Sequence, residues 1–435
     1  MPDPIPRPRV ERELAAARRR SLALLDPLSD EDQRRQHSPL MAPLAWDLGH
    51  VANYEEQWLV RAVAGTGAPR AGRADLDEVY DAFRHPRPSR PGLPYLGPAE
   101  ARGYADRVRD AALAVLDRAD TGAPLVDGGF VYGMVAQHEH QHDETMLATR
   151  QLMGERATPP EGTGPPPAGG PVGPAEVLVP GGTYTVGTDL EPWAYDNERP
   201  SHAVELAPFW MATAPVTCGE YLAFVEAGGY RQRRWWSEEG WAWCRQEEAT
   251  APLFWRREGP ASWSVLRFGR RLDLPGDQPV QHVCWHEAEA FARFAGRRLP
   301  TEVEWEVAAS AVPGGGRCRF PWGDEAPAPG RANLGQVCDG PAPVGAYPAG
   351  ASAWGCHQLL GEVWEWTASD FEAYPGFRTF PYREYSEVFF GSGYKVLRGG
   401  SWATAPVAAR ATFRNWDFPI RRQIFSGFRL ARDGP

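Results

Sequence analysis

The chain lacks several features that would assign it to common protein classes. No apolar run approaches the roughly 20 residues that a membrane span needs. The first residues, Met1-Pro2-Asp3-Pro4, lead into charged residues and not into the apolar core of a signal peptide. The six cysteines are scattered without a CxxC pair, which is typical of reduced thiols and not of a disulfide framework. From these absences we expect a soluble, cytoplasmic protein.

An excess of positive charge is also absent. The 46 Lys and Arg residues are outnumbered by 56 Asp and Glu residues, which gives a formal net charge of −10. This balance argues against nucleic acid or an anionic membrane as the main partner. With 435 residues, of which 43% are hydrophobic, the chain can form two or three domains with sizeable cores. The composition leaves the oligomeric state open.

A proline- and glycine-rich segment divides the chain. Twelve of the sixteen residues from 159 to 174 are proline or glycine, and such a segment can neither continue a helix nor pair in a sheet. We therefore predict a helical domain over 1–156, a linker over 157–176 and a second domain over 177–435. In the second domain, strands are expected over 177–187 and brief helices near 218–226 and 287–295, the pattern of a loop-rich α+β domain.

The first region has the pattern of a four-helix bundle. Helices are predicted over 11–25, from Ser38 onward, over 97–120 and over 129–154. In the last of these, a 4-3-4-3-4 stripe has the spacing of a seam that faces the interior of a bundle. The stripe consists of Val131, Val135, His138, His142, Thr145 and Thr149.

Three histidines have the arrangement of metal ligands. His138 and His142 lie one helical turn apart, so both can face one ion, and His50 from a neighbouring helix can supply the third ligand. Three neutral imidazoles leave coordination positions open, which suits a catalytic ion better than a structural one. They do not choose between zinc and iron(II). His140 is about 200° around the helix from each of its flanking histidines, and we predict it on the surface.

The same run of residues fits the H-E-x-x-H pattern of zinc hydrolases, with Glu139 as the general base. The extended metzincin pattern requires glycine at 145 and histidine at 148, where this chain has Thr145 and Ala148. A zinc hydrolase is therefore a remote alternative.

Longer segments resemble a known family. The run from Trp46 to Glu55 and the segment 138–142 resemble the DinB-like bundle of iron-dependent sulfoxide synthases. The second half resembles the formylglycine-generating-enzyme domain, which has the C-type-lectin-like fold, in the segments 215–217, 296–306, 361–367 and 397–402. Formylglycine-generating enzymes use a copper-binding cysteine pair, and the run 398–402 has no cysteine, so copper chemistry is not expected. In this order the two halves resemble the ergothioneine-biosynthesis family of iron(II) sulfoxide synthases, which includes the hercynine oxygenases.

This resemblance implies a reaction and a cofactor. It implies Fe(2+) held by His50, His138 and His142, with molecular oxygen as co-substrate. The enzymes of the family form a C–S bond between γ-glutamylcysteine and the imidazole of Nα-trimethylhistidine (hercynine) and oxidise the sulfur. We therefore expect small-molecule substrates. The late segment 414–425 is especially similar to the family.

The resemblance also implies a binding site for the thiol substrate. Arg87 and Arg90, in a proline-broken loop, would bind the carboxylates of γ-glutamylcysteine, and Asp417 would accept from its ammonium group. Prolines reduce the entropy that such a loop loses when it presents two guanidinium groups.

The second substrate would meet a different set of residues. Gln141 would hydrogen-bond its imidazole, and Asn415 and Trp416 would lie beside the trimethylammonium group, which has no N–H to donate. Tyr382 is expected to donate a proton near oxygen, with Tyr385 lining the histidine-derived substrate, and these two roles could be exchanged.

Two further alternatives stay open. A related sulfoxide synthase could use cysteine as the thiol, or unmethylated histidine as in ovothiol synthesis. A more remote alternative is a non-catalytic lectin-like binding protein with a structural metal, although structural zinc usually has four protein ligands.

Overall fold

The computed structural model describes residues 5–65, 70–119 and 122–435. The chain forms two compact units. The first consists of Met1–Glu161 and Glu191–Ala194, and the second of Gly162–Leu190 and Tyr195–Pro435. The chain therefore leaves the second unit for four residues and then returns to it.

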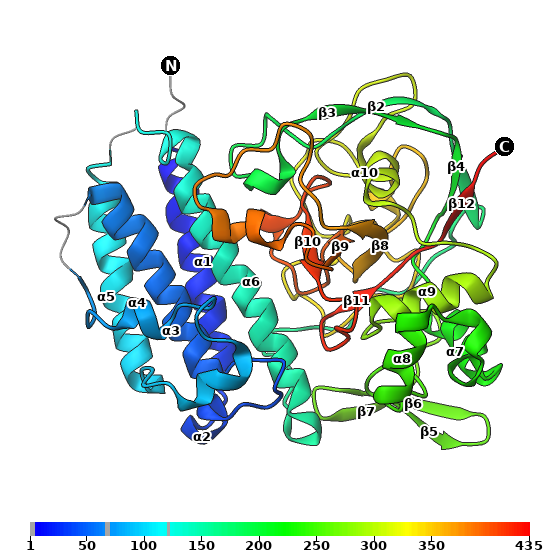
Figure 1. Cartoon of the computed structure of the whole chain (residues 1–435), viewed down its shortest axis with the longest axis horizontal. Helices are drawn as coiled ribbons and strands as arrows, with labels where there is room; N and C mark the ends of the chain where they lie inside the picture. Colours follow the sequence, from blue (N-terminus) through cyan, green and yellow to red (C-terminus); the bar gives the residue numbers. More distant parts are fainter. Residues whose placement is uncertain (1–4, 66–69, 120–121) are drawn as a thin grey trace. The chain divides into compact units, whose positions relative to one another are not determined.

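The first unit is a bundle of four long helices (Figure 1). These are α1 (Arg7–Leu25), α3 (Leu44–Glu55), α5 (Pro98–Leu116) and α6 (Phe130–Leu152). Helix α1 packs on α6, and α3 packs on both α5 and α6. The shorter elements are α2 (Asp30–Arg34), the π-helix η1 (Glu56–Ala62), α4 (Leu76–Val79), and the 3-10 helices η2 (Arg87–Gly92), η3 (Asp127–Gly129) and η4 (Gly154–Arg156).

The four predicted helices are confirmed, with differences at their boundaries. Helix α1 begins at Arg7 and not at Glu11, and α5 ends at Leu116, whereas its predicted end at 120 lies outside the described residues. Helix α3 begins at Leu44 and not near Ser38. Pro43 has the extended conformation in front of this helix (φ −59°, ψ 138°), and a proline disfavours the helical conformation of the residue before it. A helix that began at Ser38 would have to pass through this proline.

The interior of the bundle contains buried charges as well as apolar side chains. Arg18 of α1 donates from Nε to Glu139 (2.7 Å) and from NH2 to Glu55 (2.8 Å). Arg109 of α5 donates to the same two carboxylates. Four side chains from four helices thus form one ionic cluster, which fixes α1, α3, α5 and α6 relative to one another.

The second unit is a loop-rich α+β domain with several small sheets. Its sheets have the strand orders β1-β4-β12, β10-β9-β8-β11, β2-β3 and β5-β6-β7. The strands are β1 (Glu176–Val179), β2 (Gly182–Val186), β3 (His202–Leu206), β4 (Phe209–Ala212), β5 (Trp255–Gly259), β6 (Ser262–Arg267), β7 (Arg270–Asp273), β8 (Trp364–Asp370), β9 (Lys395–Arg398), β10 (Asn415–Asp417), β11 (Ser426–Gly427) and β12 (Ala431–Asp433).

The helices of the second unit are short. The α-helices are α7 (Cys218–Glu226), α8 (Glu238–Gln246), α9 (Trp285–Phe294) and α10 (Glu302–Ser310). The 3-10 helices are η5 (Asp196–Glu198), η6 (Gly229–Arg231), η7 (Arg233–Trp235), η8 (Pro348–Gly350), η9 (Arg383–Tyr385), η10 (Glu387–Phe389) and η11 (Pro406–Ala408). The strands predicted over 177–187 and the two helices predicted near 218–226 and 287–295 are confirmed. The helix at 218 has a capping box, in which Thr217 and Glu220 satisfy each other's backbone amides.

The proline- and glycine-rich segment is fastened to the second unit by backbone contacts. The amide of Gly164 donates to the carbonyl of Val337 (2.9 Å), and the amide of Gly170 donates to that of Val344 (3.3 Å). The Cβ of any other residue at 169 would lie 2.8 Å from the Val344 carbonyl oxygen, so glycine permits this close approach.

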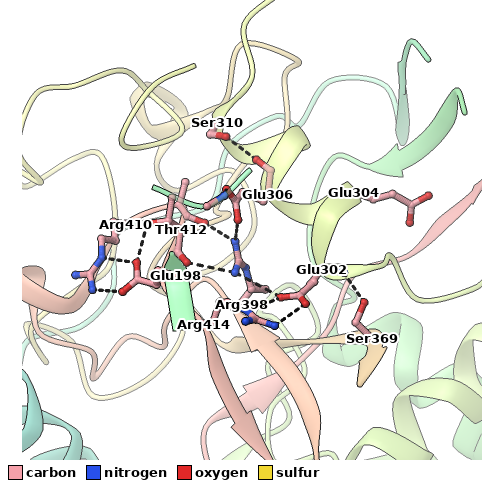
Figure 2. Close-up of polar contacts among 12 residues, drawn as sticks. Glu198, Glu302, Glu304, Glu306, Ser310, Ser369, Arg398, Arg410, Thr412 and Arg414 are labelled. Carbon is pink, nitrogen blue, oxygen red and sulfur yellow. Dashed lines mark hydrogen bonds and ion pairs between the residues drawn. The ribbon is translucent and has the colours of Figure 1, made fainter. Parts of the chain in front are cut away.

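Buried ion pairs join distant parts of the second unit (Figure 2). Each links an arginine from the last 40 residues to a glutamate: Arg398 to Glu306, Arg410 to Glu198, Arg414 to Glu302 and Arg429 to Glu365. A buried charge is costly unless it is paired and hydrogen-bonded. These pairs therefore determine where the loops around them lie.

Two expectations from composition can be compared with the structure. The six cysteines are free thiols, as predicted, and all but Cys318 are buried. Among the described residues, no helix is both long enough and apolar enough to cross a bilayer.

Candidate metal centre and substrate residues

The three histidines that were predicted as ligands come together in the first unit. His50 comes from α3, and His138 and His142 come from adjacent turns of α6. One ring nitrogen of each lies within 4.8 Å of those of the other two. Metal–nitrogen bonds of about 2.1 Å put the ligands of one ion roughly 3 to 4 Å apart, so ring movements of about 1 Å would bring these atoms into one coordination sphere.

Hydrogen bonds orient two of the rings. The Nδ1 of His50 lies 2.8 Å from the Tyr80 carbonyl oxygen, and the Nδ1 of His142 lies 3.2 Å from Oδ1 of Asp47. A carbonyl and a carboxylate only accept, so each Nδ1 carries the hydrogen. The lone pair is then on Nε2, which is the usual arrangement of a metal-binding histidine.

Burial favours the neutral form of two of the three candidate ligands. Burial lowers the pKa of His50 and of His138 well below 6.5, and the neighbouring His142 lowers both further. The His138 ring stacks on Tyr54 with a centroid distance of 3.8 Å, and its Nδ1 is buried without a hydrogen-bond partner among the described residues. Neutral imidazoles are the form that binds a metal, so the donor set fits iron(II) or zinc.

The position of His140 differs from the prediction. It is buried and not on the surface, with Nδ1 3.0 Å from Oδ2 of Asp143. The side of α6 that carries His140 is covered because α1 packs against this helix, and Ser21 of α1 also donates to Asp143 (2.6 Å). A helix that is covered on two sides has little exposed surface. A residue that points away from the candidate metal ligands can therefore still be buried.

Glu139, the general base of the hydrolase alternative, has other partners. Its carboxylate accepts from Arg18 (2.7 Å), Ser21 (3.0 Å) and Arg109 (3.2 Å). Burial opposes its ionisation, but the two arginines outweigh burial and lower the pKa of Glu139. A carboxylate with this many donors belongs to the ionic cluster and is a poor base for a water molecule.

The loop that carries Arg87 and Arg90 lies in the first unit as well. The Arg90 guanidinium stacks over the Trp46 ring at 3.8 Å, and its Nε donates to the His85 carbonyl (3.0 Å). Trp46 also stacks with the His50 ring, with a centroid distance of 4.8 Å. Burial lowers the pKa of Arg90 to about 10, which still leaves it cationic at neutral pH. Arg87 and Gln141 are half-buried.

The remaining candidate residues cluster in the second unit. Tyr385 packs edge-on against Trp416 with centroids 5.8 Å apart, and Tyr382 lies 6.3 Å from Tyr385. Asn415, Trp416 and Asp417 form β10, which pairs antiparallel with β9. Trp416 also stacks on Phe371 at 4.1 Å. Both tyrosines and the tryptophan thus belong to one aromatic group.

Two partners of the histidines were not predicted. Asp47 lies three residues before His50, about one helical turn away, and this spacing was a signal that a carboxylate would lie near the candidate ligands. Tyr80 acts through its backbone carbonyl. A backbone group has no signal in the side-chain pattern, so this contact could not be found from the sequence.

Two family models match the chain. The DinB superfamily matches residues 13–146, and the sulfatase-modifying factor enzyme 1-like domain matches residues 165–434. Together with the sheets and helices described above, these matches confirm the predicted fold class. They define an enzyme class in which a DinB-like bundle and a formylglycine-generating-enzyme-like domain occur in one chain.

Three bacterial relatives are similar over nearly the whole length. The hercynine oxygenase of Mycolicibacterium thermoresistibile is 51% identical, covering 98% of this chain and 95% of that protein. The hercynine oxygenase of Mycolicibacterium smegmatis is 50% identical, covering 97% of this chain and 98% of that protein. That of Mycobacterium tuberculosis is also 50% identical, covering 97% of this chain and 97% of that protein. The chain belongs to the hercynine oxygenase family, and the protein is an oxygenase.

Proposed function

We propose that this oxygenase is an iron(II)-dependent sulfoxide synthase of ergothioneine biosynthesis. It joins the sulfur of γ-glutamylcysteine to the imidazole of Nα-trimethylhistidine and oxidises that sulfur. The observation that carries the proposal is the convergence of His50, His138 and His142, whose donor atoms lie within 4.8 Å of one another. The relatives named hercynine oxygenase support the choice of the second substrate.

The atoms of the reaction balance with one oxygen molecule. The thiol loses its hydrogen, the imidazole carbon loses its hydrogen, and sulfur and carbon form a bond. One oxygen atom goes to sulfur, and the other leaves as water with the two hydrogens. Bound iron(II) would supply the redox chemistry of this four-electron oxidation, and three neutral ligands leave its positive charge available to favour a thiolate.

Arg87, Arg90 and Asp417 are assigned to the thiol substrate. Arg90 is oriented in advance by Trp46 and by the His85 carbonyl, so little side-chain entropy is lost when a carboxylate binds. Asp417 is half-buried, and its Oδ2 lies 3.4 Å from Nε of Arg421. This carboxylate is the proposed acceptor for the ammonium group of γ-glutamylcysteine.

Gln141, Asn415 and Trp416 are assigned to the histidine-derived substrate. Gln141 precedes the ligand His142 on α6 and would hydrogen-bond the substrate imidazole. Asn415 and Trp416 would lie beside the trimethylammonium group, which is recognised by aromatic faces and not by hydrogen bonds.

Tyr382 is the proposed proton donor, with Tyr385 lining the histidine-derived substrate. A phenol carries an O–H group that can donate a proton. Tyr385 is buried and packs against Trp416, whereas Tyr382 is half-buried. This difference in burial supports the assignment of the donor role to Tyr382.

An oxygen-uptake experiment tests the function. Anaerobic protein is given iron(II), γ-glutamylcysteine and Nα-trimethylhistidine, and then oxygen. We expect oxygen uptake that depends on both substrates, and a sulfoxide product by mass spectrometry. Substrate binding without uptake would reject this reaction for the oxygenase.

Substrate replacement tests the finer assignment. Cysteine in place of γ-glutamylcysteine should lower kcat/KM by at least about tenfold, because cysteine lacks the second carboxylate. Histidine in place of its trimethylated form should lower it similarly, because histidine lacks the methyl groups that would contact an aromatic face. A double variant, Arg87→Ala with Arg90→Ala, should raise the apparent KM for γ-glutamylcysteine. An unchanged KM would reject this thiol as the substrate and favour the cysteine-using relative.

A further inference from the structure

One short segment of the second unit contacts both ends of the loop that carries the two candidate tyrosines. The loop runs from Phe380 to Ser386 and is called the tyrosine loop here. Oδ2 of Asp196 accepts from the Phe380 amide (3.1 Å), and Oδ1 accepts from the Ser386 hydroxyl. Tyr382 and Tyr385 both lie between these two points, so a single carboxylate closes the loop that carries them.

The residues on either side of Asp196 contact the same loop. Asn197 donates from Nδ2 to the Ser386 hydroxyl oxygen (3.0 Å). Tyr195 stacks on the ring of Tyr385, with centroids 3.9 Å apart and planes 16° from parallel. Three consecutive residues thus bind one loop, and Ser386, on which two of them converge, is fully buried.

Buried ion pairs hold this segment in place. Glu198 accepts from Nε of Arg410 (2.8 Å) and from the Thr412 hydroxyl (2.7 Å), as Figure 2 shows. Arg414 donates to the Asn197 carbonyl (2.8 Å) and pairs with Glu302. The next residue after Arg414 begins β10, the strand of Trp416. The segment is therefore tied at one end to the tyrosine loop and at the other to the Trp416 strand.

We propose that Asp196 is a positioning residue, which fixes Tyr382 and Tyr385 relative to Trp416 so that a proton can be delivered at a defined place. This inference rests on the proposed function, because that function gives the tyrosines their roles. A misplacement of about 1 Å in a reacting group can lower a rate by about 100-fold. A carboxylate suits this task because it has two acceptor oxygens for the two donors, one at each end of the loop.

The burial of Asp196 supports a role other than stability. Asp196 is 2% exposed, and among the described residues its hydrogen-bond partners are a hydroxyl and backbone amides, without an arginine. Burial raises the pKa of Asp196 to about 6, so the ionised form is less favourable in the fold than in water. A carboxylate kept in such a place at a cost to stability is a candidate for a functional role.

Hydrogen exchange and kinetics on the iron-loaded, full-length protein test the proposal. In Asp196→Ala we expect amide exchange in peptides covering 378–390 to rise by at least about tenfold, while the rest of the second unit and the iron content stay unchanged. We also expect kcat to fall by about 10- to 100-fold, with each KM changed by less than about threefold. Asp196→Asn, which keeps one acceptor oxygen, should give an intermediate kcat.

Asp189 offers a matched control. It accepts from the amide and from the hydroxyl of Ser201, one donor on each oxygen, but it is exposed and these donors lie outside the tyrosine loop. Asp189→Ala should leave both loop exchange and kcat at the wild-type values. The proposal is overturned if Asp196→Ala leaves exchange over 378–390 unchanged, or if exchange rises equally throughout the second unit. A wild-type protein without oxygen uptake would reject the proposed function, whereas the exchange result would still report on the loop.

Discussion

The bundle and the second unit position their candidate functional residues by different means. In the bundle, the periodicity of one helix puts His138 and His142 on the same face, and a second helix adds His50. In the second unit, the candidate residues lie in a loop and in a three-residue strand. Neither element has a helical repeat that would bring side chains onto one face. Hydrogen bonds to Asp196 and Asn197 hold the loop, and buried ion pairs hold the segment of Asp196 and the residue before the strand. One chain thus positions one group of candidate residues by local structure and another group by long-range polar contacts.

The two units also differ in how far apart in the sequence the contacting residues lie. The two candidate ligands of α6 are four residues apart. In the second unit, the buried pairs of Arg429, Arg398, Arg414 and Arg410 span 64, 92, 112 and 212 residues. A long-range pair has to overcome the entropy of closing a long loop, whereas a helical turn does not. We therefore expect the second unit to depend more on single side chains than the ligand helix does.

Loss of a ligand should have the largest effect. In His138→Ala we expect the iron bound after reconstitution to fall below about a tenth of an equivalent, and substrate-dependent oxygen uptake to fall by at least about 1,000-fold. Elemental analysis and an oxygen electrode measure the two quantities. His140→Gln is the matched control on the same helix, because His140 bonds to Asp143 and not to the other histidines. Equal loss of iron in both variants would contradict the assignment of the ligands.

Breaking a buried pair should give the next largest effect and tests the second half of the comparison. Arg414→Met removes both hydrogen bonds from Arg414 to Glu302 and leaves this buried carboxylate only the longer contact with Arg398 (3.8 Å). Breaking a buried pair in this way typically destabilises a protein by about 3–5 kcal/mol. Urea denaturation followed by tryptophan fluorescence measures the change. The control is Arg293→Met, which breaks the partly exposed pair with Glu289 and should cost less than about 1 kcal/mol. Similar values for the two variants would mean that the buried pairs do not hold the second unit together.

The same contrast explains what could be predicted from the sequence. The bundle helices and the convergence of His50 with the α6 pair follow from apolar spacing and from the four-residue step. His140 was placed wrongly, because the pattern of one helix does not tell how many of its faces are covered. The contacts of Asp196 with Phe380 and Ser386 could not be predicted, because they join residues nearly 200 positions apart without a periodic signal. The resemblance to a known family pointed to Tyr382 and Trp416, but it did not say what holds them.

A smaller effect is expected where a side chain orients a ligand without binding the ion. Asp47→Ala removes the acceptor for Nδ1 of His142. Loss of such a partner typically weakens metal binding by about 10- to 100-fold. Competition with a chelator measures the iron affinity, and helical circular dichroism shows whether the bundle is intact. Asp77, which pairs with Arg61 in the same unit, gives a control variant, Asp77→Ala, that should keep the wild-type affinity. A loss of affinity in the control equal to that in Asp47→Ala would mean that Asp47 acts only on general stability.

The smallest effect concerns a buried carboxylate of the second unit that has no arginine partner. Glu362 accepts from Asn333 (3.0 Å), Gln358 (3.0 Å) and the amide of Ala342 (2.7 Å), and burial raises its pKa from 4.5 to about 8. Because the folded-state pKa is raised, the stability linked to its proton is fully present below about pH 4.5 and is lost as the pH rises through about 8.

Relative to Glu362→Gln, the wild-type protein should therefore lose about 1–3 kcal/mol of unfolding free energy between pH 5.5 and 8.5. Denaturation of both proteins at these two pH values measures this difference, and groups that titrate in both proteins cancel. If the difference does not change with pH, Glu362 is ionised throughout this range. Amide donors alone would then stabilise an ionised, buried carboxylate as well as the arginines do. The buried ion pairs would not be needed to explain how buried carboxylates are held in the second unit.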